Sequence, residues 1–368
     1  MTTSLTISKS GRHLRAGELV GRLCEKAASD LGLPSGIAIG SGVIDAYAGW
    51  IGTVGAKVPD VDICQEPSSG KSGSPAAIGE GEACTRLAVV AGTSTCHIAM
   101  SPDPVFVPGV WGPYRDVIFP GQWMAEGGQT ATGQLLKHVL ESHPAFKGAC
   151  ALAETANLNI FQYLNSRLRE MTSQSNSPSV AELARHFFFY GDLFGNRSPL
   201  ADAQITGSIV GLTSDISVDS LAIHYYGTLE FIALQTRQIV ETMNQSGHRI
   251  KSIFMSGSQC QNEILVHLIA TACNMPVVLP RYINAAVCHG AAMLGVTAAS
   301  ADLGKELGLW EVIEQMSKPG TTFFPTEGKR ERALLAAKYR VFLDQCQKQQ
   351  EYRALVDSAI TRETSTLG

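Results

Sequence analysis

The sequence predicts an α/β protein, in which a mixed sheet is flanked by helices. Three stretches carry this prediction, because in each of them an apolar strand ends in a glycine-rich turn. Residues 37–49 and 250–273 continue from the turn into a helix, whereas residues 86–100 continue into a second apolar run. Strand, glycine turn and helix in succession are typical of α/β architecture, and also of nucleotide sites.

The composition is that of a globular enzyme. The 368 residues are 45% hydrophobic and 17% charged, so they can bury a large core in one or two domains. The net charge is −4 and Lys and Arg form no block, so no nucleic-acid partner is expected. The sequence shows neither a leader pattern nor an apolar run of membrane-spanning length, so we expect a cytoplasmic protein without membrane contact.

Periodicity and turn residues predict the other elements. A first helix is expected from Leu19 to Leu31, where Gly32 and Pro34 stop it. The aromatic run at 187–190 is interpreted as core. The nine cysteines lack zinc-binding spacing and are interpreted as reduced and structural, with no metal site. Further helices are expected within 149–186, 217–245, 284–299 and 327–360, and a further strand at 276–279.

The turn of the 86–100 hairpin is a candidate phosphate site. It consists of Gly92, Thr93, Ser94 and Thr95, and it offers hydroxyls and consecutive N–H groups at its tip. Glycine permits close backbone approach, and consecutive N–H groups form an anion-binding concavity without a Walker sequence. Taken alone, the same residues also fit a plain polar hairpin turn.

Asp45 stands where a strand passes through glycines into a small-residue helix. An aspartate there is an ordinary N-cap, because its carboxylate can accept the unpaired N–H groups of the first helical turn. A carboxylate beside a glycine-rich loop can also act as a general base toward a bound hydroxyl. The residues alone leave both interpretations open.

Two other glycine-rich stretches contain residues that are typical of phosphate sites. Residues 120–140 predict a glycine-rich turn followed by a helix, whose N-terminus could meet phosphate. Residues 59–82 predict an exposed loop rich in Pro, Ser and Gly. Its Gly70-Lys71-Ser72 is not a P-loop, because Gln65 stands where the pattern needs glycine and no strand precedes it.

Taken together, five ordered segments resemble the C-terminal half of the FGGY carbohydrate kinases, closest to their ribulokinase-like branch. The segments are GSGVIDAYAGWIGTVGAKV, AGTSTCHIAM, AEGGQTATGQLLKHVL, LFGNRSPLAD and MSGSQCQNEILVHLIATACNMPVVLP. The resemblance implies an actin-like, ribonuclease-H-like ATPase domain that binds ATP and Mg²⁺ and phosphorylates a sugar or sugar alcohol, such as a D-ribulose-like ketopentose or a pentitol.

The resemblance also assigns roles to residues. It makes Asp45 the base that deprotonates the sugar hydroxyl, and it puts Gly92, Thr93 and Ser94 at a phosphate loop. It brings Gly127, Gly128 and Thr132 near the nucleotide phosphates or ribose. It puts Gly257, Ser258 and Asn262 on the adenosine motif, although Ser258 stands where a second glycine is usual.

The resemblance covers only half of a family member. Residues 1–50 would be a remnant of the interdomain region, residues 51–355 the nucleotide-side domain, and residues 356–368 a flexible tail. The chain therefore looks truncated, and an apolar face left by the missing domain could drive self-association. A non-catalytic relative that binds nucleotide or a partner protein is the alternative. A hydrolase is set aside, because neither Ser94 nor Ser258 lies in a GxSxG elbow.

Overall fold

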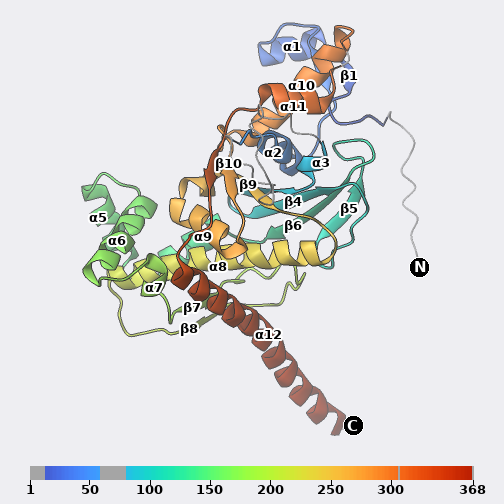
Figure 1. The fold of residues 1–368 in the computed structure, drawn as a ribbon. Coiled ribbons are helices and arrows are strands. Elements are labelled where there is room, and N and C mark those ends of the chain that lie inside the picture. Colours follow the sequence, from blue (N-terminus) through green and yellow to red (C-terminus); the bar gives the residue numbers. More distant parts are fainter. Residues whose placement is uncertain (1–12, 59–79, 306, 367–368) are drawn as a thin grey trace, which may run out of the picture.

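A seven-stranded mixed sheet forms the centre of the protein, and helices cover both of its faces (Figure 1). This computed structural model describes residues 13–58, 80–305 and 307–366. The predicted α/β class is confirmed. Residues 59–79 of the predicted loop, including Gly70-Lys71-Ser72, lie outside the described residues. The last three residues of the predicted loop, 80–82, belong instead to the short helix α3 (Glu80–Ala83). None of the described helices combines the length and hydrophobicity needed to cross a bilayer.

The strand order across the sheet is β11-β10-β9-β3-β4-β6-β5. Strands β3, β4, β6 and β5 are each antiparallel to their neighbours, with β6 between β4 and the edge strand β5. Strands β9 and β10 run parallel to β3, and β11 is antiparallel to β10. The strands are β3 (Arg86–Ala91), β4 (Thr95–Ser101), β5 (Trp111–Arg115), β6 (Trp123–Gln129), β9 (Ser252–Ser256), β10 (Val277–Leu279) and β11 (Thr321–Phe323). The predicted hairpin at 86–100 is confirmed.

One face of the sheet is covered by α2 (Asp45–Val54), α10 (Ala286–Asp302) and α11 (Leu309–Met316). Helices α2 and α10 approach so closely that a Cβ on Gly52 would lie 2.0 Å from the carbonyl oxygen of Ala286. The arginine at the start of β3 fixes the far end of α2, because Arg86 donates to the carbonyl oxygen of Val54 at 2.7 Å. Helix α2 therefore runs antiparallel to β3, with its first turn at the carboxyl end of the strand.

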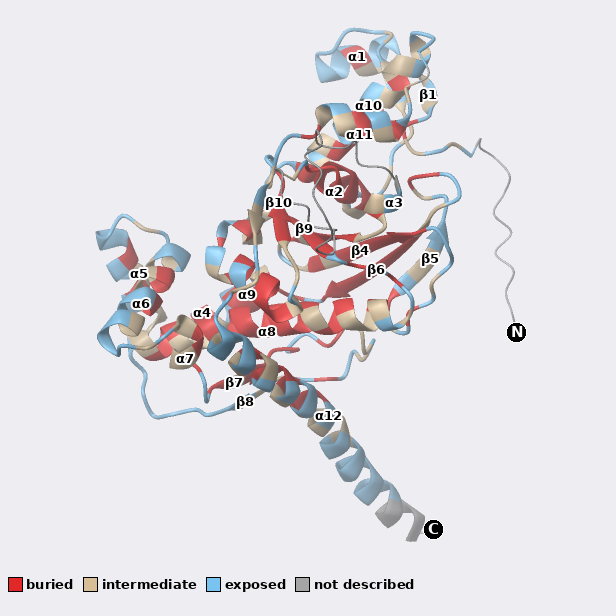
Figure 2. Ribbon diagram, viewed as in Figure 1, coloured by how far each residue is buried: buried red, intermediate tan, exposed pale blue. Residues whose placement is uncertain are grey.

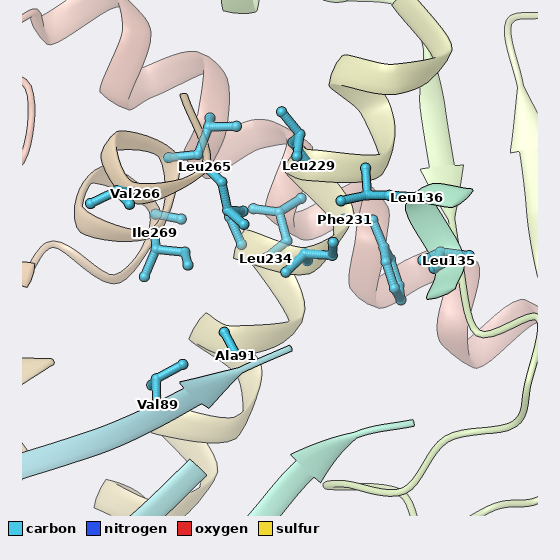
Figure 3. Packing of buried hydrophobic residues seen from close by; sticks show 14 of the residues in the cluster. Val89, Ala91, Leu135, Leu136, Leu229, Phe231, Leu234, Leu265, Val266 and Ile269 are labelled. Carbon is cyan, nitrogen blue, oxygen red and sulfur yellow. The ribbon is translucent and has the colours of Figure 1, made fainter. Parts of the chain in front are cut away.

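The long helix α8 (Val218–Gln245) lies against the other face. Its Leu229, Phe231 and Leu234 pack with side chains of α4, α9 and β3, and Figure 3 shows this packing. The helix was predicted at 217–245 and is confirmed. The remaining helices on this side are α4 (Gly133–Ser142), α5 (Phe146–Thr155), α6 (Ile160–Gln174), α7 (Val180–Leu183), the 3-10 turn η1 (Ser258–Gln261), α9 (Glu263–Cys273) and α12 (Lys329–Thr366).

Two short ribbons complete the fold. Strand β1 (Leu19–Arg22) pairs with β2 (Ala38–Gly40), and helix α1 (Glu25–Leu31) lies between them in the chain. The helix predicted from Leu19 was thus wrong over its first turn. Residues 19–22 alternate between half-buried and exposed, and they gain ladder bonds to β2 that a helix would forfeit. The other ribbon joins β7 (Phe188–Tyr190) to β8 (Ser208–Val210), and its aromatic residues are largely buried, as expected.

The glycine-rich turn predicted within 120–140 was also wrong in part. Gly127 and Gly128 lie inside strand β6, where they pair with His97 and Cys96 of β4. Pairing with a long neighbouring strand outweighs the low strand propensity of glycine. The helix predicted after this segment is present as α4.

Helices α2 and α12 each extend across an expected domain limit, the first after residue 50 and the second after residue 355. The boundary drawn after residue 50 falls inside α2, whose Trp50 and Ile51 are fully buried in one core. At the other end, α12 continues to Thr366 and projects away from the body (Figures 1 and 2). Large exposed apolar side chains lie on its last part and on the β1–α1–β2 unit, and the expected self-association remains a prediction.

A buried ion pair fixes α12 against α8. Lys338 Nζ lies 2.7 Å from Glu230 Oε1, and their side chains are 2% and 5% exposed. Lys338 also donates to the carbonyl oxygen of Ala184 at 2.7 Å. Burial raises the pKa of the Glu230 carboxyl, while the lysine charge opposes that rise.

We expect Lys338→Met to lower the free energy of unfolding by about 3–5 kcal/mol, because it leaves a buried carboxylate without a counter-charge. Urea denaturation measures the loss. The double variant Lys338→Met/Glu230→Leu is the control, and it should recover most of the stability since no charge remains. Equal losses in the single and double variants would contradict this account.

Candidate active site

Three segments that are distant in the sequence meet at the carboxyl end of β3. They are the β3–β4 turn at 92–94, the start of α4 and the η1 segment after β9. The amide of Thr132 donates to the carbonyl oxygen of Thr93 at 2.9 Å, and that of Gly133 to Gly92 at 3.1 Å. A Cβ on Gly133 would lie 2.8 Å from Gln259 Nε2, so η1 closes over the same point. The structure thus brings the predicted residues of the turn, Thr132, Gly257 and Ser258 together.

The β3–β4 turn presents donors at its tip. The Gly92 amide donates to the carbonyl oxygen of Ser94 at 2.9 Å and closes the turn. Within the described chain, the N–H groups of Thr93 and Ser94 donate to no protein acceptor, and Thr93 is exposed. Two adjacent free N–H groups beside a hydroxyl can bind a phosphate oxygen.

The start of α4 does not offer the amides that the sequence suggested. The N–H groups of Thr132, Gly133 and Gln134 donate to the carbonyl oxygens of Gly92 and Thr93. They are therefore engaged in holding the turn, and the expectation that this helix N-terminus meets phosphate through its amides is wrong for these three groups.

The Thr132 side chain holds the β3–β4 turn against the start of α4. It is 1% exposed, its hydroxyl donates to the carbonyl oxygen of Gly92 at 3.1 Å, and it lies 2.9 Å from the Thr95 hydroxyl. These contacts tie the turn to α4 and leave the hydroxyl little freedom to reach a ligand.

Gly127 and Gly128 make space inside the sheet. A Cβ on Gly127 would lie 3.1 Å from Ile239 Cγ2, on the α8 side. A Cβ on Gly128 would lie 2.9 Å from Arg197 Cζ, on the opposite side. Both glycines are buried, so in this structure they admit neighbouring side chains, and their predicted proximity to nucleotide stays a prediction.

Gly257 fixes the η1 segment directly against the end of β3. Its φ is +98°, and a Cβ at this position would lie 2.2 Å from the carbonyl oxygen of Ala91. Only glycine combines that dihedral angle with such close backbone approach. Ser258, which follows, is exposed beside the turn, whereas Asn262 is buried and bonded to Asn165 and Tyr225.

Asp45 is the first residue of α2, and its carboxylate is exposed. The N-cap position is occupied by Ile44, so the interpretation of Asp45 as the N-cap was off by one residue. The Ala46 amide lies 2.8 Å from Asp45 Oδ1. One turn further on, a Cβ on Gly49 would lie 3.1 Å from Val90 Cγ2. The first turn of α2 therefore lies at the same end of the sheet as the β3–β4 turn.

A polar cluster that the sequence analysis missed lies on the α2 side of the sheet. Arg197 Nη2 donates to Glu126 Oε1 at 2.7 Å, and its guanidinium lies 4.2 Å from the ring centre of Trp111. Burial, and secondarily the Glu126 charge, raises the pKa of the Tyr47 hydroxyl and brings that of the Cys96 thiol to about 11. Tyr47 follows Asp45 by two residues, so this cluster borders the first turn of α2.

The sequence indicates this cluster only if residues 123–129 are recognised as a strand. Side chains two residues apart in a strand lie on the same face, so Glu126 and Gly128 share one face of β6. Arg197 lies 71 residues from Glu126 in a loop, and no local pattern joins the two.

The donor set fits a phosphate better than a resident metal ion. In the described ranges, no group of three or more His, Cys, Asp or Glu side chains could hold a metal ion. Magnesium in phosphoryl-transfer sites is held largely by water, phosphate oxygens and one or two carboxylates. Asp45 is an exposed carboxylate that this end of the sheet could offer to such an ion.

A cavity of about 290 Å³ lies elsewhere, between the α6–α7 region and the start of α8. Its lining includes Arg185, His186, Leu212 and Asp215, and none of the predicted site residues. The cavity and the convergence of glycine loops are therefore separate features of the molecule.

Comparison with known proteins identifies the family. The C-terminal domain of the FGGY family of carbohydrate kinases matches residues 87–299. A D-ribulokinase of Saccharomyces cerevisiae is 49% identical over 295 residues, which are 80% of this chain and 40% of the yeast protein. An FGGY carbohydrate kinase domain-containing protein of Homo sapiens is 39% identical over 336 residues, which are 91% of this chain and 57% of the human protein. The chain spans about half the length of these curated relatives.

Solved structures agree on the fold. A xylulose kinase from Rhodospirillum rubrum matches with a TM-score of 0.63 and 18% identity, over 92% of this chain and 57% of the other. A Plasmodium falciparum glycerol kinase, solved with ADP, matches with a TM-score of 0.57 and 16% identity, over 90% and 55%. The sheet with its flanking helices is the actin-like ATPase fold of these sugar kinases. The chain belongs to the FGGY family of carbohydrate kinases, and residues 87–299 match the C-terminal domain of that family.

Proposed function

We propose that this chain supplies the nucleotide-side half of an ATP-dependent kinase for a sugar or sugar alcohol. The observation that carries the proposal is the meeting of an exposed donor turn, the η1 segment and the first turn of α2 at one end of the sheet. Phosphoryl transfer depends mainly on positioning and charge stabilisation, and these segments are suited to both.

In this proposal each segment has one task. The N–H groups of Thr93 and Ser94 and the Thr93 hydroxyl bind the transferred phosphate, and Gly257 and Ser258 contact the adenosine. Asp45 accepts the proton of the attacking sugar hydroxyl as general base. Magnesium, when bound with ATP, would neutralise charge on the phosphate oxygens.

We extend the proposal to the polar cluster beside α2. Glu126 and Arg197 form a partly buried, charge-assisted pair near Tyr47, two residues after Asp45. Carboxylate and guanidinium groups bind the hydroxyls of a polyol well. The likeness to a yeast D-ribulokinase favours a ketopentose such as D-ribulose, or a pentitol, as the substrate.

A protein that binds nucleotide or a partner without turnover is the second candidate. The donor turn and the η1 segment would serve binding alone equally well, because neither supplies a group that accepts the proton of an attacking hydroxyl.

We expect a protein of these 368 residues alone to bind ATP weakly, with a Kd on the order of 0.1 mM to several mM. The few contacts that these residues offer must offset the entropy that ATP loses on binding. Sugar-dependent ADP release should be undetectable in a coupled assay against ketopentoses and pentitols, while calorimetry measures ATP binding. Saturable, sugar-dependent release would show instead that a second copy or another chain completes the cleft. Absence of any ATP binding would count against the proposed function.

Asp45→Asn tests the proposed base. In any assembly of this chain that releases ADP in response to sugar, we expect kcat to fall about 10²- to 10⁴-fold while ATP affinity is unchanged, because an amide cannot accept the proton. Glu25→Gln is the matched control, since it removes an exposed carboxylate from the first turn of another helix. Near-full activity of the asparagine variant would make Asp45 a structural residue only.

Thr93→Val tests the phosphate turn. In any assembly of this chain that releases ADP in response to sugar, the change removes the exposed hydroxyl and roughly keeps the shape. Loss of a charge-assisted hydrogen bond should then weaken ATP binding by about 1.5–3 kcal/mol. Thr93→Ser, which keeps the hydroxyl, should bind ATP as the unsubstituted protein does. Calorimetry compares the three proteins, and unchanged affinity in the valine variant would indicate a purely structural turn.

A further inference from the structure

Asn262 occupies the N-cap position of α9 but does not cap the helix with its side chain. Asparagine is among the best N-cap residues, because its side-chain oxygen can accept an N–H group of the first turn. Here the side chain is instead buried and directed into the body of the protein. The residue therefore forgoes its usual local bond in favour of a tertiary one.

The tertiary bonds form a closed ring of three side chains from three helices. Asn165 Nδ2 of α6 donates to Asn262 Oδ1 at 3.2 Å, and Asn262 Nδ2 donates to the Tyr225 hydroxyl of α8 at 2.7 Å. The Tyr225 hydroxyl donates to Asn165 Oδ1 at 3.0 Å and closes the ring. Each member donates once and accepts once, and such closed networks strengthen each bond in a buried setting.

The ring stands at one end of the η1 segment. Asn262 directly follows Gln261, the last residue of η1, and its amide donates to the carbonyl oxygen of Gln259 at 3.1 Å. At the other end, Gly257 donates to the carbonyl oxygen of Ile283 at 2.8 Å and packs against Ala91. The four residues of η1 are thus fixed at both ends, once by backbone packing and once by the ring.

Helix α9 is stabilised by apolar packing in addition to the ring. Leu265, Val266 and Ile269 of α9 pack against the apolar side chains of α8, as Figure 3 shows. An apolar contact is non-directional and tolerates small shifts, whereas a hydrogen-bonded ring fixes orientation. The ring is therefore suited to set the position of Asn262 and of the backbone before it.

We propose that the Asn165–Tyr225–Asn262 ring is a positioning device for the nucleotide loop. It holds η1 in the conformation that receives adenosine, and Asn262 acts through the backbone of Ser258–Gln261 without touching the nucleotide. The inference rests on the proposed nucleotide binding at η1, and it replaces the expectation that Asn262 is itself a ligand.

The helix supplies a matched pair of variants. Tyr225→Phe removes the hydroxyl from the ring and leaves donor and acceptor groups unpaired around it. The next residue, Tyr226, is equally buried, and its hydroxyl has no hydrogen-bond partner in the described structure. Tyr226→Phe therefore deletes the same atom from the same helix without breaking a hydrogen bond.

A third variant separates positioning from helix stability. Asn262→Ser retains a good N-cap residue for α9 but cannot reach Asn165 and Tyr225. The hydrogen bond from Tyr225 to Asn165 remains in this variant, so the core keeps a satisfied pair.

Amide hydrogen exchange on the 368-residue protein without nucleotide is the first measurement. We expect exchange at residues 258–262 to accelerate about tenfold or more in Tyr225→Phe and Asn262→Ser, and to be unchanged in Tyr226→Phe. Amides of β4 report global stability and should change little in Asn262→Ser. Equal protection of η1 in all variants would overturn the proposal.

Binding of ADP, measured by calorimetry, is the second measurement. We expect about a three- to tenfold rise in Kd for Tyr225→Phe and Asn262→Ser, and none for Tyr226→Phe. Faster loop exchange with unchanged ADP affinity would overturn the role of the ring in nucleotide binding. If the unsubstituted protein bound no ADP, the proposed function would fail, while the exchange data would still decide whether the ring positions the loop.

Discussion

The backbone at the end of β3 is the constraint on which the candidate site depends. Three consecutive carbonyl oxygens there each meet a neighbouring segment. That of Ala91 faces Gly257, and those of Gly92 and Thr93 accept the first amides of α4. Because β3 lies in the middle of the sheet, this one strand end sets the position of the turn, of α4 and of η1 together. The free N–H groups at the tip follow from this arrangement, since the carbonyl oxygens point into the body.

The two faces of the sheet contribute differently to this strand end. On the α8 side, apolar packing and the Asn165–Tyr225–Asn262 ring support the η1 segment, and the buried Lys338–Glu230 pair fixes α12 on the same helix. On the α2 side, close helix packing fixes the first turn of α2 with Asp45, and Tyr47 of the same turn lies near the Glu126–Arg197 pair. The η1 segment and the first turn of α2 therefore approach the same edge of the sheet from opposite faces.

The predictions from sequence that were confirmed rest on local signals. The hairpin at 86–101, the long helix α8 and the strand before Gly257 follow from periodicity and turn residues within one segment. Gly127 and Gly128 could not be recognised as strand residues, because glycine gives a turn signal and their pairing partner lies in β4. The Glu126–Arg197 pair and the ring around Asn262 join segments 71 or 97 residues apart, so only the folded chain brings them together.

The central claim is that nucleotide binds where the three segments meet. Backbone amide chemical shifts recorded during titration with ADP and Mg²⁺ test it most directly. We predict that the largest shifts fall on Thr93, Ser94 and Ser258, with smaller ones at the start of α4. Shifts concentrated along the cavity lined by Arg185 and His186, with the β3–β4 turn unaffected, would contradict the account.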